Sequence, residues 1–340
     1  QHHAHDFALK GDTKHETPFF VDLRAAFTHE SGERIENLPG FYDGDGTWKV
    51  RFAPNLEGKW SGVTASNDPK LDGVKLPAVE CVANDNRAVC GVMGIDPEYS
   101  HRFAWSDGTP YIYLGFECDW LFAYHQRAGD EKFRKAMDLL DERGFNCIIM
   151  NVYAHLGFSR DQDPAEHFFD PPDMYVFEGT NDQPDHSRLN LEFFKDFDQV
   201  MSYLHAKGIV VHLMIQVQNK EVKWPRRMTA EDDMYWRYVV ARYQAYGNIV
   251  WDTSKESYNL LNDLAEHAYV LDRINLIRTN DAYAHLVTVH DSENESWGSV
   301  SEADEASDFI SDQIHFGEPD GYNREAIRRW RDRTATGNLA

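Results

Sequence analysis

The sequence has few cysteines and few basic residues, and it lacks long apolar runs. Four cysteines occur in 340 residues without a CxxC pair, which argues against a structural zinc site. Lysine and arginine number 34 against 57 aspartates and glutamates, which gives a formal net charge of −23. Such a chain has little with which to neutralise phosphates, so we expect it to bind neither nucleic acid nor an anionic membrane surface.

No stretch of about 18 consecutive apolar residues is present, so the sequence predicts no membrane-spanning helix. No signal peptide is visible, yet the chain starts at Gln1, as a processed secreted protein or a trimmed chain would. We therefore expect a secreted or periplasmic protein, and the sequence indicates no oligomeric state. Cys81 and Cys90 could close a small loop, whereas Cys118 and Cys147 lie in predicted core strands and are expected to be free.

The composition provides apolar residues for a small module and a larger domain, with 42% hydrophobic and 13% aromatic residues. Residues 1–95 contain short apolar or alternating runs separated by turns such as residues 43–46, DGDG. The expected strands are 19–23, 48–52, 60–64 and 79–82. Regular short strands of this kind predict an all-β sandwich. The module has no acidic pair at a strand end, so we expect an accessory role for it.

Residues 96–340 follow a different pattern, in which apolar strands alternate with amphipathic helices. The expected strands are 111–116, 147–150, 209–215, 248–251, 286–289 and 309–313. The expected helices are 130–143, 191–207, 229–246, pieces of 257–278, and 324–333. A long polar loop that ends near Asn190 is expected to cover a site.

This alternation predicts a parallel sheet covered by helices. Polar residues at the strand ends favour a (β/α)8 TIM barrel with its site at the carboxyl face. A doubly wound open sheet is the alternative, but it would place a glycine-rich loop after its first strand, where residues 117–120 read ECDW.

Residues 246–259, YGNIVWDTSKESYN, carry the clearest indication of chemistry. The predicted strand 248–251 is followed by a polar loop, 252–255, and Glu256 stands where that loop turns into the next helix. Barrel enzymes place catalytic groups at the carboxyl ends of their strands. A helix-capping or ion-paired glutamate is the structural alternative.

The spacing of Trp251 and Glu256 resembles the strand-four signature of the large clan of retaining barrel glycoside hydrolases. The segment HRFAWSDGTPYIYLGFECDWL resembles the first strand of apiosidase-like barrel hydrolases, and GFYDGDGTWKVRFAP with EGKWSG resembles the β-sandwich that often precedes such barrels. The resemblance implies a glycoside hydrolase that acts on a polysaccharide or oligosaccharide without a metal or cofactor. It implies Glu256 as general acid/base, with Asp252 as the fallback. The clan usually has Asn before this Glu, where it contacts the sugar 2-hydroxyl, and this chain has Lys255 instead.

Side chains at the predicted strand ends are the candidates for lining a sugar pocket. They are Glu117, Asp119, Trp120, Asn151, Tyr153, His155, His212, Gln216, Trp251, His290, Gln313 and His315. Trp224 and Trp297, in polar loops, are better candidates for stacking on a sugar than Trp251 is.

Two other functions stay open. The strand-end histidines His212, His290 and His315 would also suit a metal-dependent barrel hydrolase, but the HxH pair that opens such barrels is absent after strand one. A non-catalytic carbohydrate-binding protein is the other alternative.

Six of the eight strands of a complete barrel are predicted, so we expect two further strand–helix units beyond Ala340. In the resembled clan the nucleophilic Glu ends strand seven, and its counterpart is therefore also expected beyond Ala340. Neither Glu117, after strand one, nor Glu318, after strand six, is a convincing substitute. A retaining site needs two carboxyl groups ~5–5.5 Å apart, which strands four and seven can supply across the barrel mouth.

Overall fold

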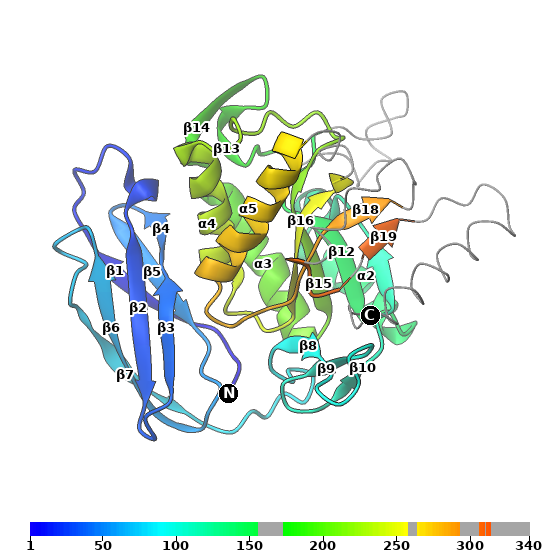
Figure 1. Cartoon of the computed structure of the whole chain (residues 1–340), viewed down its shortest axis with the longest axis horizontal. Coiled ribbons are helices and arrows are strands. Elements are labelled where there is room, and N and C mark those ends of the chain that lie inside the picture. Colours follow the sequence, from blue (N-terminus) through cyan, green and yellow to red (C-terminus); the bar gives the residue numbers. More distant parts are fainter. Residues whose placement is uncertain (156–172, 258–263, 293–305, 310, 314–340) are drawn as a thin grey trace, which may run out of the picture.

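The computed structural model describes residues 1–155, 173–257, 264–292, 306–309 and 311–313. Figure 1 shows an N-terminal pair of β-sheets, in blue, beside a larger part in which helices surround a central sheet. No helix among these residues combines the length and the apolar character needed to cross a bilayer.

The N-terminal part consists of two antiparallel sheets that share one apolar core. Its strands are β1 (His5–Lys10), β2 (Leu23–His29), β3 (Arg34–Pro39), β4 (Phe41–Gly44), β5 (Thr47–Phe52), β6 (Gly58–Ser66) and β7 (Lys75–Cys81). One sheet has the order β1-β5-β4 and the other β3-β2-β6-β7. Buried residues alternate with less buried ones along β2, as expected for a strand with one face on a core. Leu23, Phe27, Trp48 and Trp60 belong to this core.

The predicted strand 19–23 is wrong. The segment Pro18–Phe20 forms a 3-10 turn, η1, and β2 begins only at Leu23. Pro18 stands at the start of the turn, where its fixed φ is compatible with helical geometry and its missing N–H costs no hydrogen bond.

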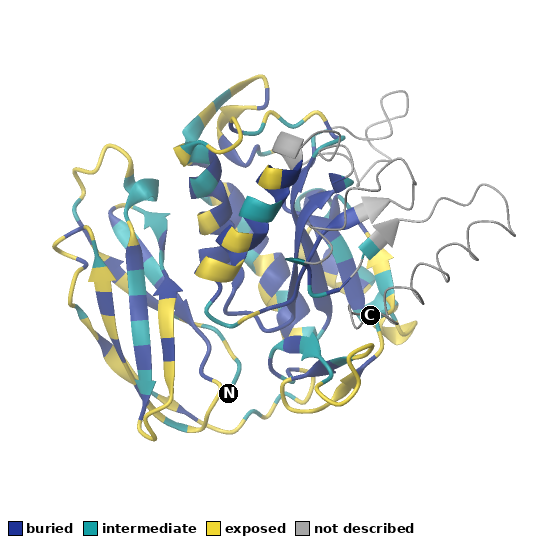
Figure 2. Ribbon diagram, in the orientation of Figure 1, coloured by how far each residue is buried: buried dark blue, intermediate teal, exposed yellow. Residues whose placement is uncertain are grey.

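A five-stranded parallel sheet forms the centre of the larger part. Its strands, in sheet order, are β11 (Gly115–Glu117), β12 (Cys147–Asn151), β15 (Val210–Val217), β16 (Ile249–Lys255) and β17 (Val287–Thr288). The helices are α1 (Leu121–Ala128), α2 (Asp130–Glu142), α3 (Leu191–Lys207), α4 (Ala230–Tyr243) and α5 (Leu264–Asn280). Every residue of β15 and β16 is buried, which is typical of parallel strands covered on both faces. Figure 2 shows this buried sheet behind helices whose outer sides are exposed.

The polar segment before α3 and the segment after β17 also contain strands. The hairpin β13 (Phe177–Thr180) and β14 (Gln183–Leu189) lies within the predicted long loop. The strands β18 (His290–Ser292) and β19 (Ser311–Gln313) pair in parallel as a separate two-stranded sheet.

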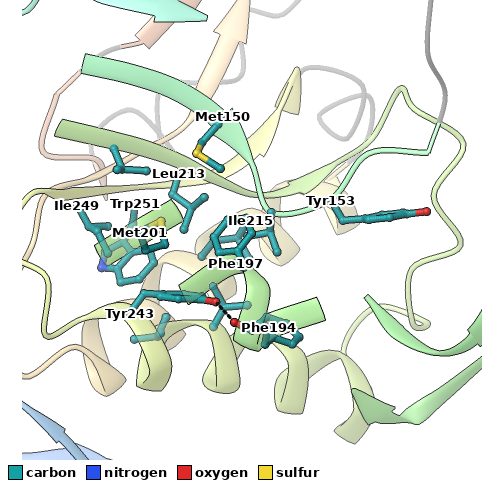
Figure 3. Close-up of a cluster of buried hydrophobic side chains, with 14 of the residues drawn as sticks. Met150, Tyr153, Phe194, Phe197, Met201, Leu213, Ile215, Tyr243, Ile249 and Trp251 are labelled. Carbon is teal, nitrogen blue, oxygen red and sulfur yellow. Dashed lines mark hydrogen bonds between the residues drawn. The ribbon is translucent and has the colours of Figure 1, made fainter. Parts of the chain in front are cut away.

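Local signals explain where α3 and α4 begin and end. The Asn190 side chain caps α3 by accepting from the N–H groups of Glu192 and Phe193, and Gly208 ends the helix with φ 67°. Thr229 caps α4 by accepting from the Asp232 N–H. The aromatic face of α3 and the helix-covered face of the sheet form the core that Figure 3 shows around Phe197, Leu213 and Trp251.

The predicted polar loop 252–255 is wrong, because these residues continue β16. Ser254 pairs with Gln216 and Lys255 pairs with Val217 on β15, so their backbone groups belong to the parallel ladder. Tertiary pairing therefore outweighs the turn-like composition of Asp-Thr-Ser-Lys.

The predicted strand 111–116 divides into two elements. Tyr111 belongs to β10 (Pro110–Tyr111), which joins β9 (Phe103–Trp105) and β8 (Met93–Ile95) in an antiparallel sheet. Between β10 and β11, the Asn146 side chain donates to the Ile112 carbonyl at 2.7 Å and accepts from the Leu114 N–H at 2.9 Å. Since this side chain satisfies the backbone, the segment needs no strand partner.

The small sheet β8-β9-β10 packs at the amino ends of the central strands. Its Met93 and Trp105 share a buried cluster with Cys147, Val210 and Val250, which stand at or near the starts of their strands. The strand β8 precedes the predicted boundary at residue 95 and pairs with β9 beyond it.

The central sheet curves strongly. β11 and β16 have β12 and β15 between them, yet Lys255 and Glu117 at their ends form an ion pair. In a flat sheet these strands would lie roughly 14 Å apart with their side chains perpendicular to the surface. The sheet must therefore curl toward the face that carries both side chains, as barrel strands do. Closure into an eight-stranded barrel stays a prediction.

The two parts meet through buried arginines. Arg51 on β5 donates to Asp198 on α3 at 3.1 Å and to the Arg242 carbonyl at 2.8 Å. Arg242 on α4 in turn donates to Asp43, at the end of β4, at 3.0 Å. Ion pairs that cross the boundary in both directions join the N-terminal sheets to the helices.

Candidate functional site

Charged side chains meet at the carboxyl ends of the first and fourth strands of the central sheet. Lys255, the last residue of β16, forms an ion pair with Glu117 at the end of β11. Its ammonium nitrogen also lies 3.2 Å from Oδ1 of Asp119. Lys255 and Asp119 are almost completely buried, whereas the Glu117 side chain is 46% exposed. The ammonium group of Lys255 therefore pairs both with the buried carboxylate of Asp119 and with the solvent-accessible carboxylate of Glu117.

The two carboxyl groups differ in pKa. For Glu117, burial is the largest single effect and opposes ionisation, but the charge and hydrogen bond of Lys255, with smaller contributions from His290 and Asp119, together outweigh it, and the pKa falls below its usual value. For Asp119, burial is the largest effect and raises the pKa, although Lys255 partly counteracts it. Burial disfavours the charged Lys255, but these two carboxylates outweigh it and raise the pKa of the ammonium group. Environments that separate the pKa values of neighbouring carboxyl groups are typical of sites that perform acid–base chemistry.

Glu256 follows this cluster and has an unusual backbone conformation. Its φ is 53°, in the left-handed region that residues with a β-carbon rarely adopt. The side chain is half-buried, and one carboxyl oxygen accepts a hydrogen bond from the Asn219 side chain. Strained backbone of this kind occurs disproportionately at functional sites. Glu256 directly follows β16, without the predicted loop between them, and its chemical role stays a prediction.

Lys220, in the segment after β15, interacts electrostatically with the same charged side chains. Burial lowers the pKa of this lysine, and the charges of Asp119, Lys255, Glu256 and Glu117 also act on it. Its ammonium nitrogen lies 5.4 Å from the centre of the Trp120 ring, a cation–π distance. Asn219 and Lys220 were not among the predicted site residues, although both come shortly after the predicted strand 209–215, as other candidates follow theirs.

A second polar group lies deeper in the sheet. His212 Nε2 lies 2.7 Å from Asp252 Oδ2, and the other histidine nitrogen is 2.7 Å from the hydroxyl of Tyr113. Asp252 Oδ1 accepts from the backbone N–H groups of Ser254 and His290. Asp252 is completely buried, so a carboxyl group that is closed to solvent and bonded through both oxygens is poorly placed to protonate a sugar. The fallback assignment of Asp252 as the acid is therefore not supported.

Several predicted pocket residues are buried beside the site. Asn151 donates to the Asp119 carbonyl at 3.3 Å, and the Tyr153 hydroxyl lies 3.3 Å from Nδ1 of the half-buried His155. Gln216 donates to Asp232 and accepts from Tyr269, a pair of contacts directed to the helices. These residues can support the site, but the structure shows Asn151, Tyr153 and Gln216 closed to solvent.

The prediction that Trp251 lines the pocket is wrong. Its ring is completely buried among core side chains, and its Nε1–H donates to Asp281 at 2.9 Å. Figure 3 shows it next to Met201 and Tyr243, which come from the helix layer. The half-buried Trp224 donates to the Val217 carbonyl and lies against Tyr235.

Three other predicted residues are not placed by the structure. His315 and Trp297 lie outside the described residues, and only the backbone of Gln313, in β19, is described. Within the described part of the chain, no group of three His, Cys, Asp or Glu side chains is arranged to hold a metal ion. All four cysteines are free thiols, so Cys81 and Cys90 do not close a loop.

Comparison with known families agrees with this arrangement of parts. A family model described as "Apiosidase-like, catalytic domain" matches residues 98–336, and a domain of unknown function (DUF5060) matches residues 1–67. A search of curated proteins found no match.

Two solved glycoside hydrolase structures match the chain, and the first of them has a similar fold. A candidate glycoside hydrolase from Bacteroides vulgatus ATCC 8482 is 24% identical, with a TM-score of 0.69 over 86% of this chain and 56% of that one. A glycoside hydrolase family 5 protein from the same organism is 18% identical, with a TM-score of 0.45 over 72% of this chain and 50% of that one. The chain thus spans about half the length of these two proteins.

Proposed function

The chain belongs to the apiosidase-like family by its catalytic domain, and from this premise we propose that the protein hydrolyses glycosidic bonds in a polysaccharide or oligosaccharide. We propose a (β/α)8 barrel, a retaining reaction, and Glu256 as the general acid/base. The single observation that carries the assignment is the position of Glu256, with φ 53°, directly after a fully buried parallel strand whose last residue, Lys255, pairs with Glu117 and Asp119.

In the proposed reaction, Glu256 donates its proton to the glycosidic oxygen as a nucleophilic carboxylate attacks the anomeric carbon and the leaving sugar departs. The Glu256 carboxylate then takes a proton from water, which attacks the same carbon and releases the nucleophile. The two displacements give overall retention. The prediction that the nucleophile lies beyond Ala340 stays a prediction, and the proposal assigns no second reacting carboxylate.

The Asn219 side chain supports the role of Glu256. A donor on one carboxyl oxygen can orient the group toward a substrate. The charges of Lys220 and Glu256 also act on each other. Secretion and polysaccharide degradation are part of the proposal.

The test compares Glu256→Gln with Glu221→Gln on a panel of 4-nitrophenyl glycosides and plant polysaccharides. Glu221 is a matched control, because it is also a glutamate in the left-handed conformation, with φ 52°, but is exposed. Loss of a general acid/base lowers the rate by ~10²–10⁴-fold, so we expect this loss in Glu256→Gln alone. Anomeric proton signals of the first product report whether the configuration is retained. Near-normal turnover by a folded Glu256→Gln variant would reject the assignment.

A further inference from the structure

Lys255 occupies a position from which its side chain reaches across the mouth of the sheet. It ends β16, and its ammonium contacts Glu117, the last residue of β11, and Asp119 just after that strand, with two strands in between. The lysine is nearly buried, so most of its aliphatic part is covered and the ammonium is confined between Glu117 and Asp119. A flexible side chain held at both of these contacts has little freedom to turn elsewhere.

The two carboxylates held by Lys255 differ in access. The Asp119 side chain is 8% exposed, and the Glu117 side chain is 46% exposed. An ionised carboxylate only accepts hydrogen bonds, and its two oxygens can serve several donors at once. Glu117 accepts from Lys255 through Oε1 and also hydrogen-bonds Asp119. Because 46% of its side chain is exposed, the carboxylate can accept further hydrogen bonds from a ligand that enters from solvent.

We propose that Lys255 is a positioning residue that holds the Glu117 carboxylate in place to accept hydrogen bonds from the hydroxyl groups of a neutral sugar. This inference rests on the proposed function, because it assigns the ligand of the same site. A neutral sugar is favoured over a sugar acid beside Glu117, because the negative charge of a sugar carboxylate would be repelled by the negative charge of Glu117.

The electrostatics predict what removal of the ammonium would do. Burial favours the neutral form of both Glu117 and Asp119, and Lys255 opposes this effect on each of them. Without the lysine, burial of Glu117 is opposed only by the smaller contributions of His290 and Asp119, and Asp119 is subject to both burial and the charge of Glu117. A lost opposite charge within ~4–6 Å raises a carboxyl pKa by about 1–3 units, so the pH at which Glu117 ionises should rise by about 1 unit or more.

The first experiment is a carbon-detected NMR titration of the Glu117 carboxyl group, with Glu117→Gln to assign the signal. We expect Lys255→Met to raise the titration midpoint by about 1 unit or more and Lys255→Arg to raise it less. Lys207→Met is the matched control, because Lys207 also bridges two carboxylates, Asp138 and Asp141, but on the outer surface. An unchanged midpoint in Lys255→Met would overturn the positioning role, and this readout requires no activity.

The second experiment measures kcat and KM for a neutral 4-nitrophenyl glycoside that the protein hydrolyses. We expect Lys255→Met and Glu117→Gln to raise KM about 10-fold or more, with a smaller effect on kcat, and the acidic limb of kcat/KM to move to higher pH in Lys255→Met. Partial rescue by Lys255→Arg would separate charge from packing. Faster hydrolysis of a 4-nitrophenyl glucuronide than of any neutral glycoside would overturn the ligand class.

These outcomes separate this inference from the proposed function. If no glycoside is hydrolysed, the proposed function fails, while the titration still tests Lys255, and chemical-shift changes caused by neutral monosaccharides still test the ligand. If Glu256→Gln is inactive but Lys255→Met matches the unmodified protein in both experiments, only the role of Lys255 fails.

Discussion

The guanidinium of Arg51, on a strand of the N-terminal sheets, donates two hydrogen bonds to the carboxylate of Asp198, on α3 of the larger part. The distances are 3.3 and 3.1 Å, and Arg242 binds the same carboxylate at 2.9 and 2.8 Å from its other side. One carboxylate thus serves two buried arginines. Burial opposes the ionisation of Asp198, but the two arginines outweigh it and lower its pKa.

We expect Asp198→Asn to destabilise the protein by about 1–3 kcal/mol, because two buried guanidinium groups lose their shared counter-charge while Arg51 keeps Asp6 and Arg242 keeps Asp43. The measurement is the free energy of unfolding in urea at pH 7. Glu192→Gln is the control on the same helix, since its ion pair with Lys195 is exposed and should be worth at most about 1 kcal/mol. Equal effects of the two substitutions would show that the buried pair does not hold the parts together.

The buried pair of His212 and Asp252 leads to a second prediction. Asp252→Asn should cost about 1–3 kcal/mol of stability, because a carboxyl oxygen bonded to His212 is replaced by a donor. It should lower turnover far less than Glu256→Gln does, because Asp252 is closed to solvent. Thermal unfolding and glycoside turnover are the measurements, and Asp185→Asn is an exposed control. An Asp252→Asn variant of normal stability but without activity would restore Asp252 as the acid.

A third prediction concerns pH and His205, at the end of α3. Burial, with smaller contributions from His3 and His2, lowers the pKa of His205 from 6.5 to about 4. Between these two pH values the unfolded chain binds a proton that the folded protein does not. Stability from this group is therefore complete above pH 6.5, falls as the pH decreases toward 4, and amounts to about 3 kcal/mol in total.

The test of this prediction is the free energy of unfolding of His205→Gln against that of the unmodified protein from pH 7 to pH 4. The difference between the two proteins should change with pH by about 3 kcal/mol over this range. The exposed His101, replaced by Gln, is the control. A constant difference across the range would show that His205 titrates alike in the folded and unfolded chain.

Elements with strong local signals could be predicted from the sequence. The helix 191–207 is predicted with the bounds that the structure has, because a capping Asn190, a regular apolar face and Gly208 all lie within one segment. The strands β12 and β15 are predicted within two residues by their apolar runs. The resemblance to the apiosidase-like family is also confirmed, by a match over residues 98–336.

Features that depend on distant parts of the chain could not be predicted in this way. The backbone between β10 and β11 is satisfied by Asn146, more than 30 residues away. The polar hairpin β13–β14 has no apolar alternation to reveal it. Tryptophan at a strand end is a residue type that can stack on a sugar. Only the packing of Trp251 against the helix layer shows that it belongs to the core.

The sequence by itself determined the type of most elements, the family, and the position of Glu256 after a strand. Helix caps, apolar periodicity and strand-end residues act over a few neighbours, so they can be read along the chain. The tertiary structure alone decided the partners of Lys255. Glu117 is 138 residues away along the chain, and the two side chains meet because the sheet curls. Curvature is set by the twist and packing of all the strands together, and no single segment of the sequence encodes it.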